Sequence, residues 1–136
     1  MPWEASRAHA GFTTADKSWL PVPYQHAALA ADRQEADKDS VLHHYRQTLA
    51  FRSAHAALRD GDMTFLDTEE DVLAFTRSKD GGTLLFVFNL SRKPVKVVLP
   101  KDIKLGKTIA MPGFTTADAG STVALAALDV FCAQMG

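Results

Sequence analysis

The sequence has a single cysteine, almost no net charge and no long apolar run, and each absence excludes a class of protein. One thiol, Cys132, cannot form an internal disulfide, so the fold depends on packing, and the sequence predicts a reducing cytoplasm. A net charge of −1 gives no long-range field that would attract nucleic acid or anionic lipid. The longest apolar run, Thr122 to Ala133, contains Asp129 and is too short to cross a bilayer. Residues 1–20 lack the basic start and apolar centre of a secretory signal, so we expect no membrane and no nucleic-acid partner.

The aromatic residues are few and unevenly placed. Residues 1–25 hold both tryptophans and three of the six prolines, and they show neither helical nor strand periodicity. A loop with large aromatic side chains normally packs them against something else. We therefore predict an aromatic loop whose Trp3, Phe12 and Trp19 either brace a neighbouring structure or stack on a sugar.

Two helices are expected after this loop. Residues 27–36 are rich in alanine and predict a short helix that ends near Asp37. Residues from Ser40 to about His55 predict a longer helix, with Asp37 or Asp39 as its N-terminal cap. Its apolar stripe repeats at helical spacing and consists of Leu42, Tyr45 and Leu49.

From Met63 onward the pattern changes to that of short strands. Residues 83–89 are almost wholly apolar and predict a central strand buried on both faces. Asp80-Gly81-Gly82 precedes them and predicts a tight hairpin turn. The other expected strands are 63–66, 72–77, 95–99, 108–111 and one or two within 121–131. We therefore predict a mostly β fold, an antiparallel β-sandwich preceded by the aromatic loop and one or two helices.

Residues that could carry chemistry have plainer explanations. His43, His44 and His55 have poor spacing for a common metal ion, and we expect no metal site and no cofactor. Cys132 lies in an apolar stretch and predicts a packed, inert thiol. Asn89-Leu90-Ser91 matches a glycosylation acceptor, but a bare tripeptide is common by chance. The run Glu69-Glu70-Asp71 predicts a solvent-facing turn.

Several motifs in order resemble one enzyme family. Between Met1 and Leu90 they fall in the same sequence as in bacterial α-glucosidases and oligo-1,6-glucosidases of the α-amylase superfamily, glycoside hydrolase family 13. The resemblance spans almost the whole chain. The motifs are Met1-Pro2-Trp3-Glu4, Gly11-Phe12, Trp19-Leu20-Pro21-Val22, Gln34 with Asp37 and Ser40, Tyr45-Arg46 with Leu49 and Arg52, Leu58, Gly61, Val72-Leu73-Ala74-Phe75-Thr76-Arg77 and Phe88-Asn89-Leu90.

The resemblance implies two domains and a parent activity. Residues 1–60 would be the tail of a (β/α)8 barrel, comprising the excursion after strand 8 and the last helix, and residues 61–136 the C-terminal β-sandwich. The parent would be a retaining enzyme acting on short α-glucosides or maltooligosaccharides. Its aspartate nucleophile, glutamate acid/base and stabilising aspartate have no matching position here, so we expect no catalytic residue and no activity from this chain alone.

Two departures from the family pattern concern the loop. Lys38 stands where the family usually has proline, and the arginine that commonly precedes the Met-Pro-Trp equivalent would lie before Met1. Substrate contact, if this loop makes any, is assigned to Trp3 and Glu4, with an oligosaccharide as ligand.

Two hypotheses remain open from the sequence. The first is a non-catalytic C-terminal fragment whose partner is the missing barrel, with the sandwich supporting barrel stability; alone, it would be disordered in residues 1–36, oligomeric or domain-swapped. The second is a free-standing β-sandwich that binds a saccharide or a protein without catalysis. They differ in whether the stripe of Leu42, Tyr45 and Leu49 faces solvent or is covered by the chain's own strands.

Overall fold

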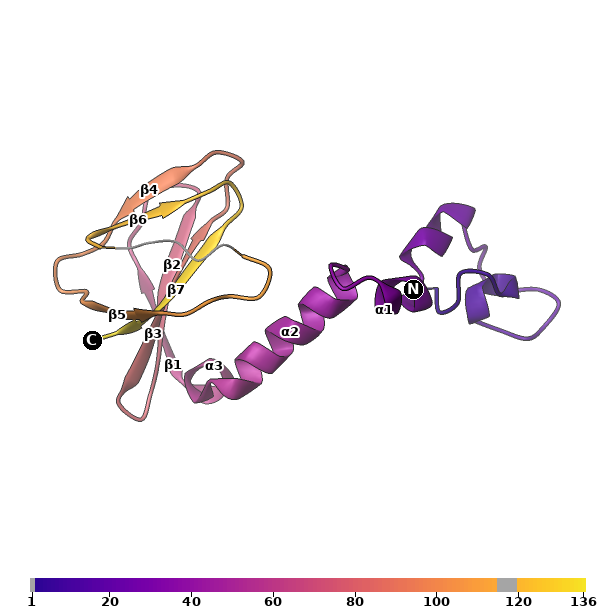
Figure 1. Ribbon diagram of the computed structural model, residues 1–136, viewed down its shortest axis with the longest axis horizontal. Helices are drawn as coiled ribbons and strands as arrows, with labels where there is room; N and C mark the ends of the chain where they lie inside the picture. Colours follow the sequence, from indigo (N-terminus) through magenta and orange to yellow (C-terminus); the bar gives the residue numbers. More distant parts are fainter. Residues whose placement is uncertain (1, 115–119) are drawn as a thin grey trace. The chain divides into compact units, whose positions relative to one another are not determined.

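The structure, a computed structural model of the 136-residue chain, describes residues 2–114 and 120–136. By compactness it divides into an N-terminal region, residues 1–47, and a C-terminal region, residues 48–136 (Figure 1). The hexapeptide Gly-Phe-Thr-Thr-Ala-Asp occurs at 11–16 and again at 113–118, and the second copy lies mostly outside the described residues.

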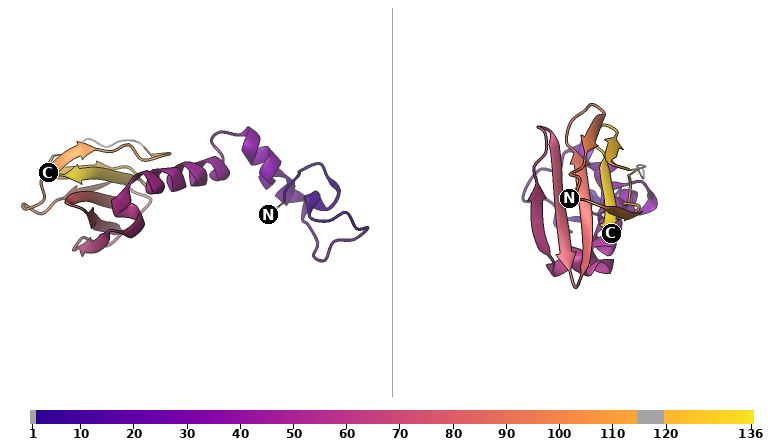
Figure 2. Two further views of the ribbon diagram at one scale, coloured as in Figure 1. Left: turned by 90° about the horizontal axis from the view of Figure 1, so that it is seen from below. Right: turned by 90° about the vertical axis from the view of Figure 1, so that its left-hand side faces the viewer.

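Two antiparallel sheets make up the C-terminal region. The larger has the strand order β1-β2-β3-β7-β5, and the smaller pairs β4 with β6. In the right-hand view of Figure 2, neighbouring strands of the larger sheet run side by side. The predicted antiparallel sandwich is confirmed. The strands are β1 (Asp62–Leu66), β2 (Val72–Lys79), β3 (Gly82–Asn89), β4 (Val95–Val98), β5 (Leu105–Thr108), β6 (Thr122–Leu125) and β7 (Val130–Met135).

A two-residue turn joins β2 to β3. Lys79 pairs with Gly82, which leaves Asp80 and Gly81 as the loop, with φ of 52° and 81°. Positive φ at both central residues matches the right-handed twist of the flanking strands. The turn predicted at Asp80-Gly81-Gly82 is therefore confirmed, and it fixes the register of the whole hairpin.

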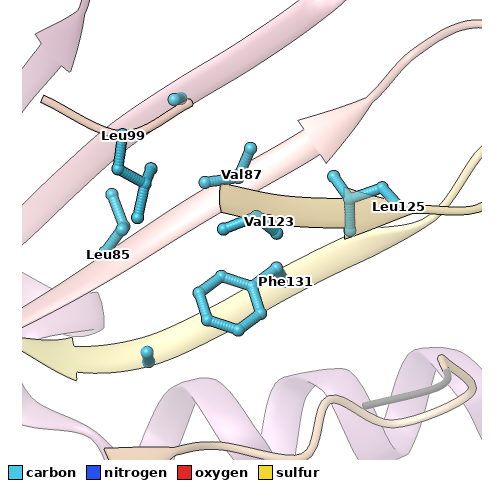
Figure 3. Packing of buried hydrophobic residues seen from close by; sticks show 8 residues of the cluster. Leu85, Val87, Leu99, Val123, Leu125 and Phe131 are labelled. Atoms are coloured by element: carbon cyan, nitrogen blue, oxygen red, sulfur yellow. The ribbon is translucent and has the colours of Figure 1, made fainter. Parts of the chain in front are cut away.

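The sandwich core lies between the two sheets. Figure 3 shows Leu85, Val87, Leu99, Val123, Leu125 and Phe131 gathered there. Leu85 and Val87 come from β3, Val123 from β6 and Phe131 from β7, and each is at most 1% exposed. The core therefore takes alternate residues from both sheets, as strand geometry requires.

β3 is buried on both faces, as its sequence predicts. Leu85 and Val87 point into the sandwich core, whereas Leu84 and Phe86 belong to a second cluster on the opposite face. This second cluster also contains Cys132 from β7. A strand in the middle of a sheet that is covered on both sides has no polar face, which explains its continuous apolar run.

The long helix is shorter and differently capped than the sequence predicts. Helix α2 spans Val41–Ala54, and the Ser40 hydroxyl oxygen accepts the backbone N–H of His43 at 3.3 Å. Ser40 is therefore the cap, and the predicted caps are wrong, because the Asp37 carboxylate instead accepts the N–H of Asp39 at 3.0 Å.

Helix α3 (Ala56–Asp60) continues the chain after a break that the sequence does not announce. His55 has extended backbone angles, φ −115° and ψ 108°, which end α2 and start the new turn. Ala57 and Leu58 then pack against the second cluster of the sheet. The helix changes direction because those two side chains gain burial there, with neither proline nor glycine at the break.

One predicted strand is misplaced. Residues 108–111 are expected to pair, whereas β5 spans Leu105–Thr108 and its register against β7 shifts between those two residues. Ile109 only continues the ladder with one bond, its N–H donating to the Cys132 carbonyl at 2.8 Å. An irregular edge strand carries no clean alternation, so its pattern misleads.

Short helical turns separated by loops form the N-terminal region. Two 3₁₀ helices span Ala8–Gly11 and Tyr24–Leu29, and α1 spans Ala31–Ala36. The alanine-rich stretch is thus divided at Ala30, whose ψ of 149° is extended. No helix in residues 2–114 or 120–136 is long and apolar enough to cross a membrane.

Candidate functional site

The backbone of Trp3 and Glu4 is held by one carbonyl oxygen. The Ala10 carbonyl accepts the N–H of Trp3 at 2.9 Å and the N–H of Glu4 at 3.2 Å. Both donors are thereby satisfied without using their side chains. The two residues predicted to contact substrate therefore sit on a fixed segment of the loop.

Three consecutive left-handed residues place that carbonyl. His9, Ala10 and Gly11 have φ of 53°, 51° and 77°. Left-handed backbone costs a non-glycine residue about 1–2 kcal/mol, so His9 and Ala10 store strain that other contacts must offset. Gly11 also allows close packing, because a Cβ there would lie 3.3 Å from Glu4 Oε1 and 3.3 Å from Trp3 Cβ.

The start of α1 holds the other side of the same segment. The Trp3 carbonyl accepts the N–H of Asp32 at 3.1 Å, and the Pro2 carbonyl accepts the N–H of Ala31 at 2.9 Å. In return, the Asp32 carboxylate oxygens accept the N–H of Ala5, each at 3.1 Å. Residues 2–5 are thus hydrogen-bonded to two separate parts of the N-terminal region.

The side chains of this segment remain accessible. Trp3 is 54% exposed. Glu4 Oε1 lies 2.7 Å from Arg7 Nη1 in a surface ion pair, which contributes little to stability. An exposed indole beside a carboxylate is a chemically reasonable sugar contact, since the ring can stack and the oxygens can accept hydroxyl groups.

An apolar groove of about 900 Å³ also lies in the N-terminal region and reaches Pro2, the residue before Trp3. It is lined by Phe12 and Trp19, whereas Trp3 and Glu4 are not among its lining residues. The structure therefore gathers two of the three predicted aromatic residues and leaves Trp3 apart. The other apolar lining residues are Pro2, Leu20, Pro21, Val22, Pro23, Leu29 and Val41, and polar side chains including Lys17 and His26 also line the groove.

The shifted carboxyl groups are unlike those of a glycosidase. The Arg46 guanidinium donates to Glu35 at 2.6 and 2.8 Å and lowers the pKa of that carboxyl. A hydrogen bond from Lys79 likewise lowers the pKa of Asp60. A general acid in glycoside hydrolysis needs a raised pKa in a cleft, so neither group is suited to that role. The predicted solvent-facing run Glu69-Glu70-Asp71 is exposed.

Two of the three histidines that suggest a metal ion in the sequence, His43 and His55, are engaged with the backbone. His43 Nε2 lies 3.1 Å from the Glu35 carbonyl oxygen. His55 Nδ1 lies 2.8 Å from the Phe51 carbonyl oxygen, and its ring packs on Phe51 with centroids 4.4 Å apart. In the described part of the chain, no group of three or more metal-ligating side chains comes together.

Cys132 is 1% exposed, and burial raises the pKa of its thiol to about 12. A thiol of that kind is protonated at neutral pH and is not a nucleophile. The predicted inert thiol is confirmed.

Asn89 has a structural role that the sequence motif hides. It is 2% exposed, and its Nδ2 donates to the carbonyls of Lys93 at 2.7 Å and Ala126 at 2.6 Å. Its Oδ1 accepts the N–H and hydroxyl of Ser91 at 2.9 and 2.8 Å. A nitrogen that makes two buried hydrogen bonds is not available for glycosylation in the folded chain. The signal for this role in the sequence is an amide directly at the end of a buried strand.

Comparisons with known proteins cover the chain from end to end. Residues 1–61 match the family "Alpha amylase, catalytic domain", and residues 63–130 match "Maltogenic Amylase, C-terminal domain". A probable α-glucosidase of Rhizobium meliloti is 36% identical over 99% of this chain and 24% of its own length. A glucan 1,6-α-glucosidase of Streptococcus dysgalactiae subsp. equisimilis is 28% identical, also over 99% of this chain and 24% of its own length. The chain therefore spans about a quarter of the length of these relatives.

Solved structures agree with these matches. The crystal structure of an α-glucosyl transfer enzyme is similar to this chain at a TM-score of 0.88 and 38% identity. The match covers 100% of this chain and 25% of the enzyme's chain. The crystal structure of a trehalulose synthase from Pseudomonas mesoacidophila is similar at a TM-score of 0.81 and 30% identity. This match covers 99% of this chain and 24% of the synthase chain. Together with the two family matches, these likenesses establish that the chain belongs to the α-amylase superfamily, glycoside hydrolase family 13.

Proposed function

We propose that this chain is the non-catalytic C-terminal portion of an α-glucosidase-like glycoside hydrolase. The observation that carries the proposal is how much of each chain the alignments cover. Nearly the whole chain aligns with only about a quarter of the length of each of two relatives. Residues 1–60 would complete a catalytic barrel, and residues 61–136 would form the domain that stabilises it. The parent would act with retention on short α-glucosides or maltooligosaccharides in the bacterial cytoplasm.

Two of the three stripe residues of α2 support this over a free-standing module. Tyr45 is 63% exposed and Leu49 is 46% exposed, whereas Leu42 is half-buried. An autonomous module would cover such side chains with its own strands, whereas a barrel helix covers them with its neighbours. Trp3 and Glu4 remain the predicted substrate contacts of the parent enzyme.

A chimera tests the proposal. The quarter of the Rhizobium meliloti protein that matches this chain is replaced by residues 1–136, and hydrolysis of 4-nitrophenyl α-glucoside is measured. We expect the chimera to hydrolyse the substrate and the 136-residue chain alone to give no rate above a matched blank. Hydrolysis by the chain alone would overturn the claim that it is non-catalytic. A folded chimera without activity, beside an active Rhizobium meliloti protein, would count against the family role.

Trp3 and Glu4 are tested in the same chimera. If they contact the sugar, Trp3→Ala and Glu4→Gln raise KM at least several-fold, because each removes a binding contact. Trp19→Ala, which alters an equally aromatic but different position, is the matched control. Equal KM values for all of these variants would show that Trp3 and Glu4 only pack.

A further inference from the structure

One face of the larger sheet carries a row of phenylalanines that the chain only partly covers. We name this the phenylalanine face; it lies opposite the sandwich core and consists of Met63, Phe65, Phe75, Phe86 and Phe88. Phe75 stacks on Phe86 and Phe88 with ring centroids 5.4 and 5.8 Å apart, and Phe65 meets Phe75 edge-on at 6.1 Å. Phe86 is 3% exposed, whereas Phe65 is 64% and Met63 is 44% exposed.

The covered part of this face is covered by a particular segment. Phe51 of α2 and Ala57 and Leu58 of α3 pack against the cluster that contains Phe75 and Phe86. All three belong to residues 1–61, which match the catalytic-domain family. The end of the catalytic-domain sequence therefore already lies on the phenylalanine face.

Arg77 fixes that contact. Its guanidinium donates to the Ala57 carbonyl at 3.1 Å and to the Gly61 carbonyl at 2.9 Å. Arg77 directly opposes Met63 across the β1–β2 ladder, on the same side of the sheet as the ring stack. Lys79, the next residue on this side of β2, is also engaged within the chain, in an ion pair with a carboxylate of α3. Both cations on this side of β2 are therefore used within the chain, and the exposed remainder of the phenylalanine face is apolar.

From this continuity we propose that the uncovered half of the phenylalanine face, Met63 and Phe65, docks the remainder of the catalytic domain of the enzyme. The inference rests on the proposed function and adds to it which surface of the sandwich the barrel occupies. An exposed phenylalanine next to a largely buried ring stack marks an interaction surface. The barrel portion is the occupant because its last residues lie on the adjacent half of the same sheet face.

Thiol mapping tests the docking. Phe65→Cys and Met63→Cys are made separately in the 136-residue chain and in the chimera, with Cys132 as a buried background thiol. We expect both new thiols to react with 5,5′-dithiobis(2-nitrobenzoate) freely in the chain and at least about tenfold more slowly in the chimera, since docking protects them. The matched control is Val98→Cys, an apolar position on β4 that is 76% exposed, and it should react equally in both proteins.

Each outcome has one meaning. An active chimera in which the thiols introduced at positions 63 and 65 react as fast as in the chain overturns the docking and leaves the proposed function intact. A chimera that does not fold overturns both the docking and the proposed function. Protection in the 136-residue chain that grows with protein concentration would assign the face to a second copy, and protection by added maltose would assign it to a sugar; either result overturns the proposal.

Discussion

The two regions of the chain use their apolar side chains in opposite ways. The C-terminal region buries large ones, with Phe131, Leu85 and Leu125 at most 2% exposed. Its N-terminal counterpart leaves large side chains facing outward, including Trp19 at 96% and Tyr24 at 83% exposed. Hydrophobic composition alone therefore does not tell which part of a chain has its own core. In the described residues of the N-terminal region, the buried ones are small: Pro2, Ala10, Ala30 and Ser40.

Spectroscopy can separate the two regions, because both tryptophans and both tyrosines lie between residues 3 and 45. Tryptophan emission therefore reports on the N-terminal region, and far-UV circular dichroism is dominated by the strands and by α2.

The largest effect is expected from the sandwich core. Phe131→Ala removes a ring that is 1% exposed between the two sheets and should lower the free energy of unfolding by about 3–5 kcal/mol. Urea titration followed by circular dichroism measures the loss, and Val98→Ala, on an exposed position, is the control. The midpoint of tryptophan emission should not move; a parallel shift would show that the two regions unfold as one.

The joint between α3 and β1 should give the next largest effect. A Cβ at Gly61 would lie 2.5 Å from the Ala57 carbonyl oxygen and 2.6 Å from the Ser78 carbonyl oxygen. Gly61→Ala should therefore cost about 1–3 kcal/mol through overpacking against backbone that cannot move away. Gly82→Ala is the matched control, since its new Cβ would be 3.5 Å from the nearest atom. Equal stability of the two variants would contradict the close approach.

Cys132 makes the stability of the sandwich depend on alkaline pH. Burial raises the pKa of its thiol from 9.0 to about 12, so the folded state holds its proton where the unfolded state has lost it. The stability that the protonated thiol contributes to the folded state is complete below pH 9 and is lost as the pH rises from 9 towards 12. The urea midpoint of the unmodified chain should thus fall more steeply above about pH 9 than that of Cys132→Ala. Parallel pH profiles would show that the thiol titrates normally.

The smallest effect is expected from the most exposed aromatic side chain. Trp19→Ala should change the free energy of unfolding by no more than about 0.5 kcal/mol, because the indole is 96% exposed and loses little packing. The emission of the remaining tryptophan, Trp3, in a urea titration measures the change, with Trp3→Phe, followed through Trp19, as a comparison. A cost near that of Phe131→Ala would mean that the N-terminal region has a core of its own.

The strands are predictable from the sequence where burial restricts the residues allowed. The β2–β3 hairpin follows from Asp80-Gly81 and from the apolar run of 83–89, since positive φ and burial on both faces each leave few alternatives. The pattern misplaces β5 because an irregularity at the sheet edge removes the alternation. The break at His55 has no local signal, because it results from the packing of Ala57 and Leu58 on residues far along the chain.

The N-terminal region is harder to predict in detail. Its left-handed residues His9 and Ala10 carry no sequence signal, because only glycine adopts that conformation at low cost. The sequence does not single out Ser40 as the cap of α2, because Asp37 and Asp39 precede it and aspartate is also a favoured capping residue. The family motifs, rather than periodicity, identify what this region belongs to.

The clamp made by Arg77 bears on how such domains can be exchanged by recombination. The boundary between the two family matches lies between residues 61 and 63. Arg77, on the later side, bonds to the carbonyls of Ala57 and Gly61 on the earlier side, and Phe75 shares a cluster with Leu58. If a different sandwich were joined at that boundary, α3 would lose the contacts that Arg77 and Phe75 make with it. Only a sandwich with arginine and phenylalanine at the equivalent positions of β2 would restore them. Successful crossovers should therefore fall before α2, so that the helix and the sheet that holds it are inherited together.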